Sequence, residues 1–227
     1  MKQEKILIWG GRSQARIVDV HLRRQGRRVG YIFDHTLDEP HFETDAEFLN
    51  KPDHLSRVLS RCTGFVVSIG GKLGAQRRMI SEHLMREFNL EPIQVISDTA
   101  IIDPDARFGN GVQIMSGACI GIATTISDFT IVNTNATVDH ECLIGPGVHV
   151  MGAAAVAGCV TVDADATIGT NATVLPRVRI RSGAQIGAAS LIRHDVPENS
   201  VVVGVPAHPL RTETPIVDTS IVAKLKN

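Results

Sequence analysis

An apolar residue recurs at every sixth position through the C-terminal half of the chain. The series begins at Ile96 and continues without a break to Ile192. A second series, of small or β-branched residues, runs in the same step from Ala100 to Val196. A step of six lies between multiples of the 3.6-residue helical period, so a helix would scatter these residues around its circumference. A coil built of three short strands, each a six-residue side, places both series inward.

This repeat predicts a parallel β-helix. Over 96–192 it makes roughly five and a half coils, enough for neighbouring coils to bury a continuous core. The unbroken register predicts that no internal loop exceeds about three residues between these points. Glycine often directly follows the bulky position, where we expect turns with φ above zero; these glycines are Gly109, Gly121, Gly145, Gly169 and Gly187.

The first ninety residues show a different pattern. Short apolar runs at 5–9, 29–33 and 64–69 alternate with helical stretches at 14–25 and 73–89. Strand–helix alternation predicts a parallel sheet whose ligand loops lie at the carboxyl ends of the strands. We therefore expect a Rossmann-like α/β half domain at 1–92, an all-β parallel β-helix at 93–211 and a tail at 212–227.

Two glycine pairs follow predicted strands of the α/β domain, at Gly10-Gly11 and at Gly70-Gly71. Backbone N–H groups there, together with the next helix N-terminus, can bind phosphate. Arg12 stands where the second glycine of a dinucleotide fingerprint belongs, and Asp34 follows about 24 residues after the first glycine. The domain also has only about half the strands of a dinucleotide fold. The pattern favours a mononucleotide or a sugar nucleotide, and it leaves open that the glycines serve only a tight turn.

Polar residues concentrate within the β-helix at 133–145. His140 falls two places after an inward position, so its side chain should point outward. An imidazole, with an ordinary pKa of about 6.5, is a suitable general base beside Glu141. Gly158 stands one coil further on, which would place its N–H about 4.8 Å from His140. A base and an N–H donor on one face suit acyl transfer, and the alternative is that His140 and His149 are solvated surface histidines.

Composition excludes several classes of protein. The 23 basic and 24 acidic residues nearly cancel, so we expect no nucleic-acid partner and no membrane partner. The apolar run at 6–9 is too short for a signal peptide, and no stretch of about 18 apolar residues occurs. The cysteines show neither CxxC nor metal-ligand spacing, which predicts reduced thiols and a cytosolic location; they are Cys62, Cys119, Cys142 and Cys159.

The run NTNATVDHECLIGPGVHVMGAAAVAGCVTV at 133–162, with the βαβ pattern before it and GVPA at 204–207, closely resembles a known family. The family is the sugar N-acetyltransferases of the bacillosamine and perosamine pathways, the NeuD/PglD-like group of hexapeptide-repeat acyltransferases. The resemblance covers about residues 4–211. It implies a left-handed β-helix, a homotrimer with clefts between subunits, acetyl-CoA as acyl donor, and a nucleotide-linked amino sugar as acceptor for surface glycan (lipopolysaccharide) biosynthesis.

The resemblance also implies roles for individual residues. His140 would be the general base, Glu141 its polar partner, and Gly158 the N–H donor to the thioester carbonyl. His149 would lie near the acetyl group and Asn133 at the sugar. The remaining implied contacts are Gly169 and Gly187 beside the pantetheine, Gly204, Val205, Pro206 and Ala207 at the adenine end of CoA, and Gly10, Gly11, Arg12, Ser13, Asp34 and Gly70 at the nucleotide sugar. No metal is implied.

The sequence departs from the family pattern at two places. The phosphate loop usually reads Gly-x-x-Gly-His, and here Ser13 and Gln14 replace its last two residues. Arg12 could compensate by meeting a phosphate charge directly. The lysine that usually follows GVPA is His208.

Three other functions compete with direct N-acetylation. The same base could serve O-acetylation of a sugar hydroxyl, as in sialic acid. A zinc hydratase on the same fold would need three histidines at coil-related spacing, which His140, His149 and His194 do not have. A non-catalytic scaffold that binds sugar nucleotides is the third alternative.

Overall fold

The computed structural model describes residues 5–225, which form two compact units. The first unit holds the chain up to Ile69, the segment Met79–Val95 and the chain from Val217 onward. The second unit holds Gly70–Arg78 and Ile96–Ile216. The units are therefore not consecutive pieces of sequence, unlike the division predicted at 1–92, 93–211 and 212–227.

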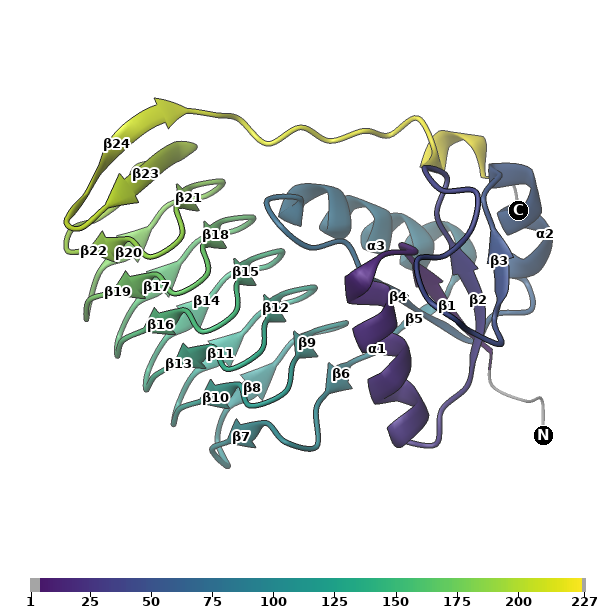
Figure 1. Cartoon of the computed structure of the whole chain (residues 1–227), viewed down its shortest axis with the longest axis horizontal. Helices are drawn as coiled ribbons and strands as arrows, with labels where there is room; N and C mark the ends of the chain where they lie inside the picture. The colour runs from purple at the N-terminus through teal and green to yellow at the C-terminus, as the bar shows by residue number, and fades with distance from the viewer. Residues whose placement is uncertain (1–4, 226–227) are drawn as a thin grey trace. The chain divides into compact units, whose positions relative to one another are not determined.

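The first unit is a parallel sheet with helices (Figure 1). Its strand order is β3-β2-β1-β4-β5, and each neighbouring pair is parallel. The elements are β1 (Ile6–Trp9), α1 (Ser13–Arg24), β2 (Val29–Phe33), β3 (Glu47–Leu49), α2 (Pro52–Leu59), β4 (Gly64–Val67), the part of α3 (Gly74–Phe88) from Met79 onward, and β5 (Glu91–Pro92). The predicted Rossmann-like alternation is confirmed, while β3 and α2 had no counterpart in the sequence prediction.

The core of this unit lies where the sheet meets its helices. The residues of β1 are all buried, and Trp9 packs edge-on against Phe33 of β2 with ring centroids 4.7 Å apart. Ile80 and Leu84 of α3 are buried in the same unit. Val222, in the short 3-10 helix η1 (Val222–Lys224), belongs to this core. Residues 217–225 therefore complete the first unit.

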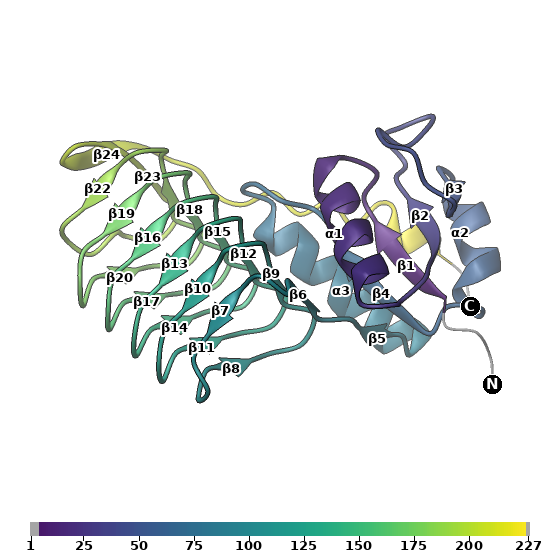
Figure 2. The same ribbon diagram turned by 60° about the horizontal axis from the view of Figure 1, so that its bottom comes forward.

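The second unit is a parallel β-helix made of two-residue strands (Figures 1 and 2). The strands recur in a six-residue step, so the predicted absence of a long internal loop is confirmed. They are β6 (Val95–Ile96), β7 (Ile101–Ile102), β8 (Arg107–Phe108), β9 (Gln113–Ile114), β10 (Cys119–Ile120), β11 (Thr125–Ile126), β12 (Ile131–Val132), β13 (Thr137–Val138), β14 (Leu143–Ile144), β15 (His149–Val150), β16 (Ala155–Val156), β17 (Thr161–Val162), β18 (Thr167–Ile168), β19 (Thr173–Val174), β20 (Arg179–Ile180), β21 (Gln185–Ile186) and β22 (Leu191–Ile192).

Each strand of the coil pairs with the strand three places further along the chain, which builds three sheets. Val138 pairs with Ile120 below and with Val156 above, for example. Both predicted series point inward: Val138 and Val156 are 1% exposed, and Ala136 and Ala154 are fully buried. The hexad pattern thus sets the register, because a slip of one residue would turn the bulky series to solvent.

The glycines after the bulky positions have a different role from the predicted one. Positive φ occurs at the third place after the bulky residue, as at Glu141 (56°) and Gly147 (71°), and not at Gly121 or Gly145. A Cβ on Gly121 would lie 2.7 Å from the backbone nitrogen of His140 in the next coil. The expectation of left-handed turns at these glycines was wrong, and close stacking of coils explains them instead.

An antiparallel hairpin ends one of the three sheets. β23 (Ser200–Gly204) pairs with β21 in parallel and with β24 (Ala207–Thr212) in antiparallel orientation. β24 is the last strand of this sheet.

None of the helices between residues 5 and 225 is both long and apolar enough to span a bilayer.

Candidate active site

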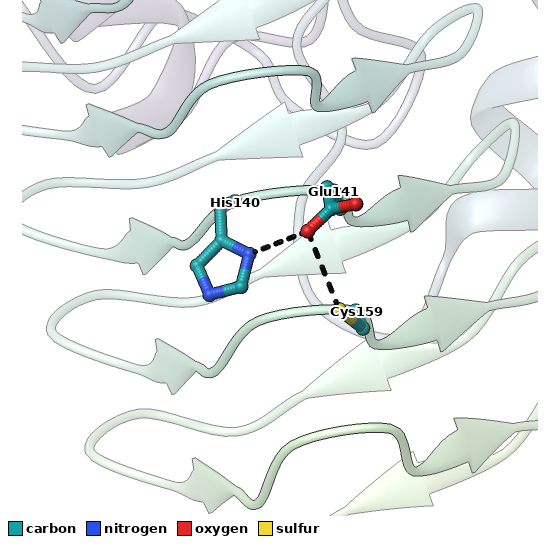
Figure 3. A group of neighbouring side chains, drawn as sticks. All are labelled: His140, Glu141 and Cys159. Atoms are coloured by element: carbon teal, nitrogen blue, oxygen red, sulfur yellow. Dashed lines mark hydrogen bonds and ion pairs between the residues drawn. The ribbon is translucent and has the colours of Figure 1, made fainter.

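His140 and Glu141 occupy the turn between β13 and β14, and both side chains are exposed (Figure 3). The Asp139 carboxylate accepts the backbone N–H of His140 at 2.8 Å, which holds the turn. His140 Nδ1 lies 3.0 Å from Glu141 Oε2. A carboxylate can only accept, so the neutral imidazole carries its proton on Nδ1 and presents the lone pair of Nε2. Nε2 is therefore the basic atom of this pair.

Gly158 lies one coil above His140. A Cβ at Gly158 would overlap the imidazole atoms Nε2 and Cε1 of His140, so the ring can take this position only over a glycine. The carbonyl of Gly158 accepts the N–H of Arg177 at 3.1 Å, while no residue within 5–225 accepts the N–H of Gly158. His140 Nε2 thus lies against Gly158 of the next coil.

His149 lies elsewhere on the β-helix, in β15, and is 2% exposed. The Asn133 carboxamide oxygen accepts the N–H of Thr134 at 2.7 Å, which turns its NH₂ group toward His149 Nε2 at 3.2 Å. Nε2 is therefore an acceptor, and the ring proton sits on Nδ1, 3.3 Å from the carbonyl oxygen of Gly71. The surface interpretation fails for His149, and Asn133 is already engaged by its neighbours.

Burial holds His149 in its neutral form. Desolvation, and next the nearby Arg77 charge, lower the pKa of His149 to about 3. The Gly70 backbone lies close to the ring, since a Cβ there would be 3.3 Å from His149 Cε1. Gly70 therefore packs against His149.

The free energy of unfolding should fall as the pH drops below about 6.5, because an unfolded imidazole protonates near that pH and folded His149 does not. Between the two pKa values the unfolded chain binds one more proton, so stability rises with pH and is lost on acidification. Between pH 7.5 and 5 the loss should be about 2 kcal/mol. The measurement is urea unfolding of wild type and His149→Gln across this range. If the two proteins lost stability in parallel, His149 would not be the responsible group.

Arg77 is fully buried at the start of α3, and no pattern in the sequence indicated a functional residue there. Its guanidinium donates to the carbonyl oxygens of Phe129 at 2.7 Å, Gly147 at 2.7 Å and Val148 at 3.1 Å. Burial lowers the pKa of Arg77 to about 10, against the opposing charge of Asp165, so the group stays cationic at neutral pH. Arg77 fixes segment Gly70–Arg78, and with it the carbonyl that binds His149.

In the predicted phosphate loop of the first unit, the N–H groups of both glycines donate hydrogen bonds within the protein. The N–H of Gly10 donates to the Phe33 carbonyl at 2.8 Å, and the N–H of Gly11 donates to Asp34 Oδ2 at 2.9 Å. Burial raises the pKa of Asp34, but hydrogen bonds from Thr36 and Gly11 outweigh it and leave the pKa below its ordinary value. Neither glycine N–H is open to a phosphate. The idea that these two groups cradle phosphate was wrong, and the tight-turn alternative describes them.

Two other residues of the predicted phosphate loop, Arg12 and Ser13, lie at the start of α1. Arg12 precedes the first helical residue, Ser13, and its side chain is exposed, with Nη2 3.3 Å from Thr36 Oγ1. A guanidinium on the surface at a helix N-terminus suits an anion.

The residues predicted for CoA lie at the far end of the β-helix. A Cβ on Gly169 would lie 2.7 Å from the backbone of Gly187, so stacking of coils accounts for the missing side chain. Gly204 has φ of 107° and begins the GVPA turn, in which Val205 is 72% exposed. Pro206 and Ala207, together with His194 and His208, line a hollow of about 330 Å³.

Solved structures share this fold over almost the whole chain. PerB from Caulobacter crescentus, in complex with CoA and GDP-perosamine, is 28% identical, with a TM-score of 0.83 over 91% of this chain and 97% of that one. The acetyltransferase domain of PglB from Neisseria gonorrhoeae, in complex with acetyl coenzyme A, is 25% identical, with a TM-score of 0.81 over 91% and 99%. WeeI from Acinetobacter baumannii, at 22% identity and a TM-score of 0.79 over 91% and 100%, shares the fold. No family model and no curated protein matches the sequence.

The likeness to PerB and to the PglB domain confirms the resemblance to the hexapeptide-repeat sugar acyltransferases. It also confirms the fold class, an α/β half domain followed by a parallel β-helix.

Proposed function

We propose that this chain is an acyltransferase that moves an acetyl group from acetyl-CoA to the amine of a nucleotide-linked amino sugar. The single observation that carries the proposal is the imidazole of His140, which bonds to Glu141 and packs directly against Gly158 of the next coil. The two neighbours that are 25% and 28% identical are structures with acetyl coenzyme A, or with CoA and GDP-perosamine. They support both the donor and the class of acceptor.

The chemistry follows as direct transfer. Nε2 of His140 takes a proton from the sugar amine as the amine nitrogen attacks the thioester carbonyl. The N–H of Gly158 donates to the oxygen that gains negative charge, and Glu141 stabilises the imidazolium that forms. When the tetrahedral intermediate collapses, the C–S bond breaks and the imidazolium returns its proton to the CoA sulfur. No covalent acyl-enzyme is required.

His149 has a supporting role in this proposal. Its neutral, buried ring cannot take a proton at physiological pH, so it suits contact near the acetyl group and not proton removal. Asn133 bonds to that ring, and it would contact the sugar next to His149. His140 belongs to a turn between two sheets and His149 to a strand of the third sheet, so the two would meet in a cleft between subunits of a homotrimer.

The start of α1 and the GVPA turn would bind the two substrates. The exposed Arg12 and Ser13 at the start of α1 would meet the phosphates of the sugar nucleotide, Asp34 would hold the loop that presents them, and the glycines would allow the turn. Gly70 would position the ring of His149. The GVPA turn and the hollow beside it would take the adenine end of CoA, with Gly169 and Gly187 on the path of the pantetheine. The four cysteines form no disulfide with one another, which fits a cytosolic location. The acetylated product would enter surface glycan synthesis.

A substrate screen tests the proposed function. The purified protein is mixed with acetyl-CoA and with UDP-, GDP- or dTDP-linked amino sugars, and release of the CoA thiol is followed by a thiol reagent. We expect one amino sugar to be turned over and the matching sugar with a hydroxyl in place of the amine to be inert. Turnover of the hydroxyl sugar alone would establish O-acetylation instead. Binding of a sugar nucleotide without thiol release from any mixture would identify a scaffold.

A further inference from the structure

A thiol lies beside the proposed base pair and takes no part in acetyl transfer. Cys159 Sγ is 3.7 Å from Glu141 Oε2, the same oxygen that bonds to His140 Nδ1 at 3.0 Å (Figure 3). We call His140, Glu141 and Cys159 the His-Glu-Cys cluster. Their potential ligand atoms all lie within 4.8 Å of one another. Within residues 5–225 no other three side chains of the metal-binding types come as close.

The coil itself brings these three side chains together. Glu141 and Cys159 occupy equivalent places in successive coils, and both adopt positive φ, 56° and 60°. The N–H of Cys159 donates to the His140 carbonyl at 2.9 Å, which ties the two turns to each other. Side chains that leave equivalent turns in the same direction stack about 4.8 Å apart. The backbone therefore holds the turns that carry these three side chains one strand spacing apart.

The chemistry of the cluster matches a zinc ion. Zinc binds thiolate at about 2.3 Å and imidazole nitrogen or carboxylate oxygen at about 2.0–2.2 Å, in a tetrahedral arrangement. Ligand atoms around such an ion lie about 3.3–3.7 Å apart, by tetrahedral geometry applied to those bond lengths. The two separations of 3.0 Å and 3.7 Å are already near these values. Three protein ligands and one open position define a site that is accessible from solvent.

We propose that the His-Glu-Cys cluster binds one zinc ion per chain, and that this ion inhibits the transferase reversibly. Zinc would bind to His140 Nδ1, a Glu141 oxygen and the Cys159 sulfur. The thiol proton leaves to solvent, and the imidazole proton moves from Nδ1 to Nε2 because Nδ1 now holds the metal. Nε2 then carries a hydrogen and has no lone pair to accept one from the amine. The inhibitory half of this proposal rests on the proposed function; the binding half does not.

Cys159→Ala separates the zinc site from the proposed catalytic residues. Ala153 and Ala189 occupy equivalent turn places with φ of 55° and 56°, so the coil accepts alanine there. The matched control is Cys119→Ala, which removes another half-buried thiol, from β10. Ala155 already stands at the equivalent place two strands along that sheet, in β16.

Binding is measured first, by calorimetric titration of the full chain with zinc chloride alone. Wild type and Cys119→Ala should bind one zinc per chain and release one proton, detected by repeating the titration in buffers of different ionisation enthalpy. Cys159→Ala should bind at least ten-fold more weakly, with no thiol proton released. Equal binding by Cys159→Ala, or no binding by wild type, would overturn the zinc site.

Inhibition is measured next, with the amino sugar that the screen identifies. Zinc should inhibit wild type and Cys119→Ala, and a chelator should restore their rates. Cys159→Ala should keep the wild-type rate without zinc and need at least ten-fold more zinc for half-inhibition. Zinc binding by a chain that acetylates no sugar would remove the proposed function and leave the site standing. Active protein whose rate is unaffected by saturating zinc would overturn the inhibitory half.

Discussion

Replacing His140 with alanine should lower kcat for acetyl transfer by about 10²–10⁴-fold, the range expected for loss of a general base. The KM for acetyl-CoA should change far less, because the imidazole acts on the amine and not on the donor. The measurement is steady-state kinetics of thiol release at saturating sugar nucleotide. The side chain of His140 is 47% exposed, so the variant should unfold at the wild-type temperature.

Two further variants serve as comparisons for the kcat of His140→Ala. His54→Ala removes an exposed histidine from α2 in the first unit and should leave kcat unchanged. Glu141→Gln keeps the hydrogen-bonding shape but removes the charge that steadies the imidazolium, so its kcat should lie between those of wild type and His140→Ala. If His140→Ala retained activity within a few-fold of wild type, the imidazole would be a surface group and the base would have to be sought elsewhere.

Replacing Arg77 with alanine should reduce the free energy of unfolding of the β-helix unit by about 3–5 kcal/mol. The change leaves the carbonyls of Phe129, Gly147 and Val148 without their donor and opens a cavity where a large side chain was fully buried. The measurement is urea unfolding followed by circular dichroism. The pKa of His149 should also rise, since the Arg77 charge is one of the two effects that lower it.

The neighbouring arginine provides the control for this variant. Arg78 is part-exposed and pairs with Asp165 at 2.8 Å. Arg78→Ala removes this ion pair but leaves no buried set of carbonyls without its donor, so it should destabilise less than Arg77→Ala. Equal losses from the two variants would mean that general charge balance, and not the buried set of carbonyls, accounts for the effect.

The β-helix was predictable because its pattern is local and repeated. Ile96 to Ile192 follow one step, and an error at one hexad would have been visible at the next. The pairing of His140 with Glu141, and their position under Gly158, followed from the same arithmetic, since equivalent places in successive coils are neighbours.

The remaining features depend on contacts that no period encodes. Arg77 reaches carbonyls of β-helix turns 52 to 71 residues later in the chain, and His149 meets a carbonyl 78 residues earlier. Asp34 accepts the N–H of Gly11, a group that the sequence pattern predicted would bind phosphate. A glycine pair before a helix looks the same whether its N–H groups face a ligand or a carboxylate, so the outcome depends on where the next strand ends.

The β23–β24 hairpin has a consequence for how copies of the chain meet end to end. A stack of parallel coils ends in a row of unpaired N–H and C=O groups, which is a template for adding another strand. Here the last strand of one sheet is β24, which contains Pro209 and runs antiparallel to its neighbour. A proline has no N–H to offer, and the reversed direction breaks the pattern that a further coil would have to continue. The hairpin therefore caps that sheet against growth into fibres, as terminal caps do in other solenoid proteins.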